Sequence, residues 1–199
     1  YEISACLVGS EMCIRDSLMR MGVNFTKQIV DCLYTGISTD TGCFRYTNTT
    51  ADTFRIAASL VELGCNSAYI NKVMFETKSK EKIMLEREVY DTITYCANEK
   101  CAIVWVTLDM LKSLNIGEDE IEGLASIPRQ IEGVLIGITM KEKEGGFFKI
   151  SVRTNGNIDA AKFCSRFGGG GHKAAAGCSI NGSLEDVRSQ LIKAAEETL

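Results

Sequence analysis

The spacing of apolar positions changes near Lys100. Before it, apolar residues recur at the three- and four-residue intervals of amphipathic helices. The predicted helices carry these inward positions: Ile29, Val30 and Leu33; Phe54, Ala57, Ala58 and Val61; Ile70, Val73 and Met74; and, within a charged stretch over 76–99, Leu85, Val89, Thr92, Ile93 and Cys96. The first half of the chain is therefore expected to be mostly helical.

After Lys100, short apolar and alternating runs predict strands over 101–107, 134–140, 147–153 and 178–180. Helices are expected over 108–114 and 118–126, in a segment that contains Ala160, Phe163, Cys164 and Phe167, and after Ser183, which can cap the last one. In the third strand, Ile150 and Val152 point one way while Ser151 and Arg153 point the other. Strands alternating with helices predict an α/β domain.

One stretch near the end combines features of a phosphate site. Gly168, Gly169, Gly170 and Gly171 are followed at once by the only histidine, His172, then by Lys173 and three alanines that can open a helix. Glycines let backbone N–H groups approach a ligand closely, and N–H groups with nearby cations bind anions. The alternative is a flexible linker, which the following His-Lys-Ala-Ala-Ala-Gly disfavours.

Two common phosphate motifs do not fit this stretch. A Walker A loop requires Ser or Thr after Gly-Lys, and here Lys173 follows His172 and precedes alanine. The dinucleotide fingerprint requires a strand before the glycines. The preceding segment instead has helical spacing, and Gly168 stands where a left-handed C-cap belongs.

Composition narrows the class of protein. The chain has 199 residues, 45% of them hydrophobic, and a net charge of −4, which argues against a surface that coats nucleic acid. Nine cysteines without a Cys-x-x-Cys pair and a single histidine argue against structural zinc and favour a reducing cytoplasm. No apolar run approaches the ~20 residues of a membrane span, so no membrane partner is expected.

Arg153, the segment Ile158–Ala161 and the motif Phe167–Gly177 carry a resemblance. From about Gly22 to Leu199 the chain resembles the C-terminal portion of DHH-family phosphoesterases. Among these it is similar to the small bifunctional enzymes that degrade very short RNA and dephosphorylate 3′-phosphoadenosine 5′-phosphate. The resemblance implies the mostly helical end of a catalytic domain over 18–76, a connector helix over 77–99, and a smaller α/β substrate-binding domain with a mixed sheet over 100–199. Residues 1–17 look like translated linker sequence and are expected to be non-native or disordered.

The resemblance also implies roles for individual residues. Asp40, in the polar turn 39–42, matches the last metal-binding aspartate of a two-metal site that usually holds Mn²⁺. From the residues alone, a turn-capping role for Asp40 stays open. The implied substrate-binding residues are Arg153, Gly169, Gly170, Gly171, His172 and Lys173, with Arg129 as a weaker match, and either arginine as an ordinary surface cation stays open. We interpret His172 as a hydrogen-bond donor to the ligand, because no other metal-binding side chain lies near it in the sequence.

The remaining metal-binding motifs of the family contain histidines, and this sequence has none before His172. We therefore interpret the chain as a C-terminal fragment without catalysis of its own. Its expected partners are short single-stranded RNA or a nucleoside bisphosphate, and a homodimer stays open. The alternatives are a non-catalytic nucleotide-binding module, a cyclic-dinucleotide phosphodiesterase, and a RecJ-type exonuclease, the last disfavoured by the acidic charge.

Overall fold

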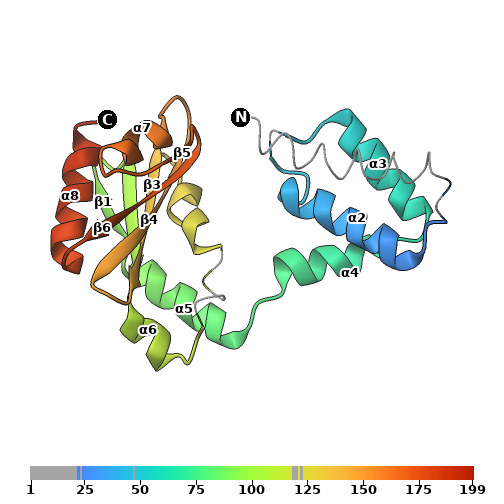
Figure 1. Cartoon of the computed structure of the whole chain (residues 1–199), viewed down its shortest axis with the longest axis horizontal. Coiled ribbons are helices and arrows are strands. Elements are labelled where there is room, and N and C mark those ends of the chain that lie inside the picture. The colour runs from blue at the N-terminus through green and yellow to red at the C-terminus, as the bar shows by residue number, and fades with distance from the viewer. Residues whose placement is uncertain (1–21, 23, 47, 118–120, 122) are drawn as a thin grey trace. The chain divides into compact units, whose positions relative to one another are not determined.

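The computed structural model describes residues 22, 24–46, 48–117, 121 and 123–199. The stretch 1–17, interpreted above as linker sequence, lies outside the described residues. The chain divides into two compact units, Tyr1–Thr77 and Lys78–Leu199 (Figure 1). Each unit is described by itself.

Unit 1 is helical, as the apolar spacing predicted. It contains α2 (Lys27–Asp40), α3 (Ala51–Glu62), α4 (Ser67–Asn71) and the π-helical turn η1 (Lys72–Glu76). The side chains of Thr26, Thr50 and Asn66 each accept a backbone N–H bond at a helix N-terminus, as is usual for these residue types. The helices close over a core of Val30, Leu33, Tyr34, Ile37, Ile56, Ala57, Leu60, Cys65 and Ile70.

The predicted inward face of α3 is correct at Ala57, which is buried, and wrong at Phe54, Ala58 and Val61, which are exposed. The other buried apolar positions are Ile56 and Leu60. Thr53 heads the buried face because it exchanges capping-box hydrogen bonds with Thr50. Val73 and Met74 are also exposed rather than inward, because the π-helical turn breaks the phase of the preceding helix. The expected turn 39–42 begins later, since α2 continues to Asp40.

Unit 2 is an α/β domain with a six-stranded mixed sheet, which confirms the predicted fold class. The strand order is β1-β2-β3-β4-β6-β5, and every neighbouring pair is antiparallel except β2 and β3. The strands are β1 (Thr94–Cys96), β2 (Cys101–Val106), β3 (Ile136–Lys143), β4 (Phe147–Thr154), β5 (Gly170–His172) and β6 (Ala175–Asn181). The helices are α5 (Lys80–Asp91), α6 (Leu108–Ser113), the 3₁₀ turns η3 (Leu124–Ser126) and η4 (Pro128–Gln130), α7 (Ala160–Ser165) and α8 (Leu184–Glu196).

Three predicted helices differ from the structure. The charged helix over 77–99 ends at Asp91, and the β-favouring Thr94–Cys96 pairs with β2 instead. The alanines after Lys173 open no helix, because Ala175 and Ala176 belong to β6. Of the helix predicted over 118–126, residues 118–120 and 122 lie outside the described residues, and Leu124–Ser126 is a 3₁₀ turn.

The two faces of the sheet are covered differently. On one face, β3, β4 and β6 present apolar residues to α7 and α8, which lie over them (Figure 1). On the other face, α5, α6 and η3 pack on Val104 and Val106 of β2, and Thr139 of β3 bonds to the Leu124 carbonyl. These covering elements contact the β2 and β3 side of the second face, and the polar positions of β4 and β6 line a hollow, described next.

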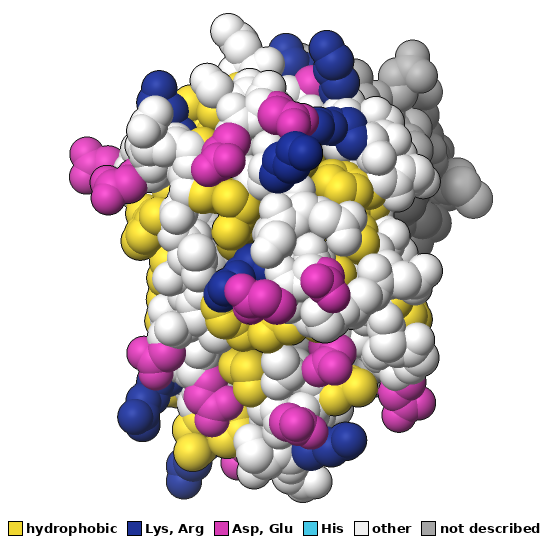
Figure 2. Space-filling model, turned by 90° about the vertical axis from the view of Figure 1, so that its left-hand side faces the viewer, with side chains coloured by type: hydrophobic (Ala, Val, Ile, Leu, Met, Phe, Trp, Pro, Cys, Tyr) yellow, Lys and Arg dark blue, Asp and Glu magenta, His cyan; other side chains and the backbone are white. Residues whose placement is uncertain are grey.

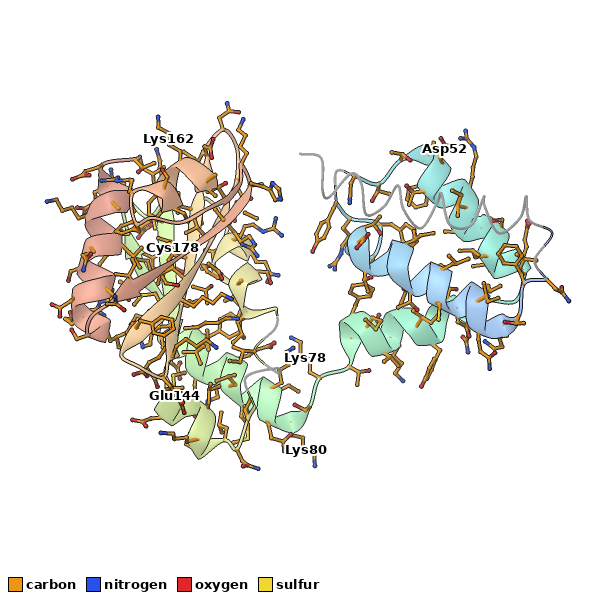
Figure 3. All side chains as sticks on the ribbon, viewed as in Figure 1. Asp52, Lys78, Lys80, Glu144, Lys162 and Cys178 are labelled. Atoms are coloured by element: carbon orange, nitrogen blue, oxygen red, sulfur yellow. The ribbon has the colours of Figure 1, made fainter. Side chains whose placement is uncertain are left out.

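Phe163 anchors α7 to the sheet, and its loss should be costly. Its side chain is 2% exposed within the main core. We expect Phe163→Ala to lower the free energy of unfolding by about 3–5 kcal/mol, since it removes apolar contacts and leaves a cavity. Urea unfolding measures this change. Lys162→Ala is the matched control, because Lys162 points outward from the same helix (Figure 3), and an equal loss in both variants would contradict the anchoring role.

Candidate functional site

A hollow of about 660 Å³ lies where the glycine stretch meets the sheet. It is lined by Lys149, Ile150, Ser151, Arg153, Phe167, Gly168, Gly169, Gly170, Gly171, Ala175, Ala176, Gly177, Cys178 and Ser179. These residues come from β4, from β6, and from the segment that leads out of α7 into β5. The structure therefore brings Arg153 and the glycines together, as the sequence predicted.

Strand register determines which side chains share the face of the hollow. Arg153 pairs with Gly137 on β3 and with Ala175 on β6, and Ala175 pairs with His172 on β5. Directly paired residues present their side chains on the same face, so Arg153 and His172 belong to one row across the sheet. His172 is exposed on the edge strand and does not line the hollow itself. The geometry places it at the rim.

The glycine stretch is an ordered part of the sheet, so the linker interpretation is wrong. Gly168 has a φ of 71°, and it forms the predicted left-handed end of α7. The N–H groups of Gly168 and Gly169 donate to the carbonyls of Ser165 and Cys164, at 3.1 and 3.0 Å. These two N–H groups are already hydrogen-bonded within the protein. They are therefore not available to a ligand, and the four glycines do not all contribute to an N–H cradle.

The individual glycines serve different purposes. A Cβ atom on Gly169 would lie 2.2 Å from the Gly177 carbonyl oxygen, and one on Gly171 would lie 2.6 Å from the Ala176 Cα. Both glycines allow close approach to β6. A Cβ atom on Gly170 would meet nothing within 4 Å, although Gly170 lines the hollow. The missing side chain of Gly170 therefore leaves open space in the hollow, whereas the missing side chains of Gly169 and Gly171 allow contact with β6.

Lys173 lies in the two-residue turn between β5 and β6. Its carbonyl oxygen accepts hydrogen bonds from the Ala160 N–H at 2.8 Å and the Thr154 hydroxyl at 3.1 Å. These bonds fix the hairpin to the end of β4 and the start of α7. The side chain is exposed, and Lys173 is outside the lining of the hollow.

Arg129 lies in η4, on the same face of the sheet as Arg153. A Cβ on Gly137, the β3 partner of Arg153, would lie 2.8 Å from the Arg129 backbone nitrogen. Asn155 holds this segment by donating to the Arg129 carbonyl at 3.3 Å. The backbone of Arg129 is thus close to the Arg153 row, and its half-buried side chain does not line the hollow.

Asp40 belongs to unit 1, at the C-terminal end of α2. Its Oδ2 atom is buried and has no hydrogen-bond partner among the described residues, and the same holds for Asn48 Oδ1 and Thr49 Oγ1. Asn48 donates from its amide to the Asp40 carbonyl at 3.1 Å. An unpaired buried carboxylate oxygen fits a metal-ligand role. However, the described part of the chain contains no group of three or more His, Cys, Asp or Glu residues that could hold an ion. Asp40 supplies one ligand, and a two-metal site does not fit these residues alone.

Several lining residues were missed by the sequence reasoning. Lys149, Ser151 and Ser179 line the hollow, and the first two share the alternating face of β4 with Arg153. The alternation of side chains along β4, which predicted the face on which Arg153 lies, also predicts that Lys149 lies on that face. Phe167, whose ring centroid lies 6.1 Å from that of Phe163, also borders the hollow.

The Cys164 thiol is a packing group. Cys164 and Cys178 are buried in contact with each other, and Cys178 lies on β6 in the sheet (Figure 3). The hydrogen bond to Cys178, together with burial, raises the pKa of the Cys164 thiol well above its ordinary value. A thiol held neutral is a poor nucleophile, so Cys164 does not suit covalent catalysis.

Charge outside the hollow is mixed. On the face shown in Figure 2, Lys and Arg side chains alternate with Asp and Glu, without a large basic area. Within the parts of the chain that the structure describes, no helix has the length and apolar character needed to cross a membrane.

The sequence of unit 2 matches the model of a known domain family. The chain belongs to the DHHA1 domain family, whose model matches residues 98–199. This match, with the relatives below, confirms the resemblance to the C-terminal portion of the DHH family.

Among curated proteins, the bifunctional oligoribonuclease and PAP phosphatase NrnA of Thermus thermophilus is 29% identical over 188 residues, covering 94% of this chain and 56% of that protein. The enzyme of the same name from Bacillus subtilis is 24% identical, covering 80% of this chain and 50% of that protein. The chain thus spans about half the length of these relatives. A crystal structure of an exopolyphosphatase-related protein from Bacteroides fragilis superposes with a TM-score of 0.83 at 24% identity, covering 94% of this chain and 56% of that one.

Proposed function

We propose that unit 2 binds the phosphate of a short nucleotide ligand in the hollow. The observation that carries this proposal is that Arg153 and the open backbone at Gly170 line the same space. A guanidinium forms paired, charge-assisted hydrogen bonds with phosphate, and β5 is an edge strand whose alternate N–H groups face away from β6. His172 at the rim adds a further donor.

The proposed substrates are short single-stranded RNA and 3′-phosphoadenosine 5′-phosphate, acted on by a phosphoesterase of the DHH family. The names of the Thermus and Bacillus relatives support this assignment. In the same proposal, 18–76 is the end of the catalytic domain, 77–99 the connector and 100–199 the substrate-binding domain. Cytoplasm is the proposed compartment, since the described cysteines are free thiols.

The proposed cofactor is a pair of divalent ions, Mn²⁺ in the first instance. When bound, such ions activate water and neutralise phosphoryl oxygens. Asp40 would provide one ligand through its unpaired Oδ2. The other ligands must come from outside the described residues, so the chemistry assigned to this chain is binding and orienting the phosphate.

A two-part experiment tests the proposal. Calorimetry should show binding of a 5′-phosphorylated RNA dinucleotide, while incubation with Mn²⁺ should show no hydrolysis above that of an Asp40→Ala, His172→Ala variant. The physical reason is that one carboxylate does not hold two ions. Absence of binding would reject the site. Turnover clearly above the variant would instead show that this chain carries a complete catalytic centre.

A further inference from the structure

The face of the hollow has cations at both ends. Along β4, Lys149, Ser151 and Arg153 alternate toward it. Lys149 pairs with Ser179 on β6, and Ser151 pairs with Gly177, which pairs in turn with Gly170 on β5. A floor of small residues therefore separates Lys149 from Arg153.

Lys149 is available to a ligand. Its side chain is exposed, and no carboxylate in the described part of the chain forms an ion pair with it. Its β3 partner Lys141 directs its Nζ atom to the Ile121 carbonyl at 3.3 Å. Lys149 is thus the cation that this end of the hollow presents.

We propose that Lys149 binds a second phosphate, so that the hollow holds two successive phosphates of one ligand along β4. This inference rests on the proposed function, with the first phosphate at Arg153. The two residues are four positions apart on one strand, which separates their Cα atoms by about 13 Å. At this separation the two cations meet different phosphates of one ligand, with a nucleoside between them.

The floor between the cations suits a sugar and base. A Cβ on Gly177 would lie 3.0 Å from the Ile150 carbonyl oxygen, and Gly170 offers open space opposite it. Phe167 supplies an aromatic ring beside this floor, and bases stack on such rings without sequence preference. Lys149 accordingly selects for a second phosphate rather than for base identity.

Titrations with ligands of increasing length test the inference. The probes are adenosine 5′-monophosphate, adenosine 3′,5′-bisphosphate, and 5′-phosphorylated di- and triribonucleotides. We expect Lys149→Ala to weaken binding of the bisphosphate and the two oligonucleotides about tenfold, the effect of one charge-assisted phosphate contact, because each of them carries a second phosphate on the 3′ oxygen of the first nucleoside. Binding of the monophosphate, which lacks this second phosphate, should stay unchanged. Lys193→Ala, on exposed α8 surface, changes net charge equally and should leave every affinity unchanged.

The outcomes separate this inference from the proposed function. Wild-type protein that binds the oligonucleotides, with affinities that Lys149→Ala does not alter, would overturn the inference and leave the proposed function standing. Equal losses of affinity in Lys149→Ala and Lys193→Ala would show that the effect comes from net charge alone, and would also overturn the inference. A loss for the monophosphate as large as for the oligonucleotides would show that Lys149 contacts the first phosphate, and would overturn the inference. Wild-type protein that binds none of the probes would overturn both.

Discussion

Gly171→Val should destabilise unit 2 by roughly 2–4 kcal/mol and abolish nucleotide binding. Gly171 has a φ of 148°, which side-chain-bearing residues rarely adopt, and a Cβ there would lie 2.7 Å from the Ala175 carbonyl oxygen. Strain at one such position costs about 1–3 kcal/mol, and the contact with β6 adds to it. Thermal melting followed by circular dichroism measures the change.

Gly170→Val is the matched control on the neighbouring residue. Gly170 lacks the positive φ, and added atoms enter open space in the hollow. We expect this variant to keep the wild-type melting temperature and to lose the rise in melting temperature that saturating nucleotide produces. A full ligand-induced rise in Gly170→Val would remove the glycine stretch from the site, and a stable Gly171→Val would contradict the close packing of β5 on β6.

Arg153→Ala should weaken binding of a 5′-phosphorylated dinucleotide about ten- to hundredfold. Losing one charge-assisted phosphate contact costs about 1.5–3 kcal/mol. Arg153 is half-buried in the lining of the hollow, and its Nη1 atom donates to the Val152 carbonyl at 3.1 Å, which limits its rotation. Calorimetry gives the dissociation constants directly.

The variant Arg153→Lys distinguishes the contribution of positive charge to phosphate binding from that of the planar guanidinium. Lysine keeps the positive charge and loses the planar pair of donors, so we expect an intermediate affinity. Wild-type affinity in Arg153→Ala would place the phosphate elsewhere in the hollow. Loss of secondary structure in Arg153→Ala would identify a structural role instead, and circular dichroism of the unliganded variant detects it.

The sequence predicted the sheet better than the helices around it. The runs that became β2 and β3 are apolar and contain several β-branched residues, and the run that became β4 alternates between buried and more exposed positions. In all three strands the local pattern therefore agrees with the tertiary structure. Ala174–Ala176 shows the opposite case. Alanine favours helix locally, but Ala176 is buried in the sheet core and pairs with Val152, and this non-local pairing outweighs the propensity.

The site was predictable where it followed from strand alternation and less so where it depended on loop paths. The alternation of side chains along β4 predicted the face on which Arg153 lies, and the same alternation puts Lys149 on that face. Arg129 was a motif match alone, and only the packing of η4 over Gly137 shows which strand its backbone approaches. The use of the Gly168 and Gly169 N–H groups in ending α7 depends on hydrogen bonds that sequence spacing does not specify.

The order β4-β6-β5 has a consequence for how the site forms. The glycine strand β5 pairs only with β6, and the two form a short hairpin that would be marginal in isolation. The hollow exists only after this hairpin docks on β4, through long-range contacts that form slowly. A ligand that touches both Arg153 and Gly170 binds the docked state alone. By mass action, a bound nucleotide would then suppress local opening of the hairpin.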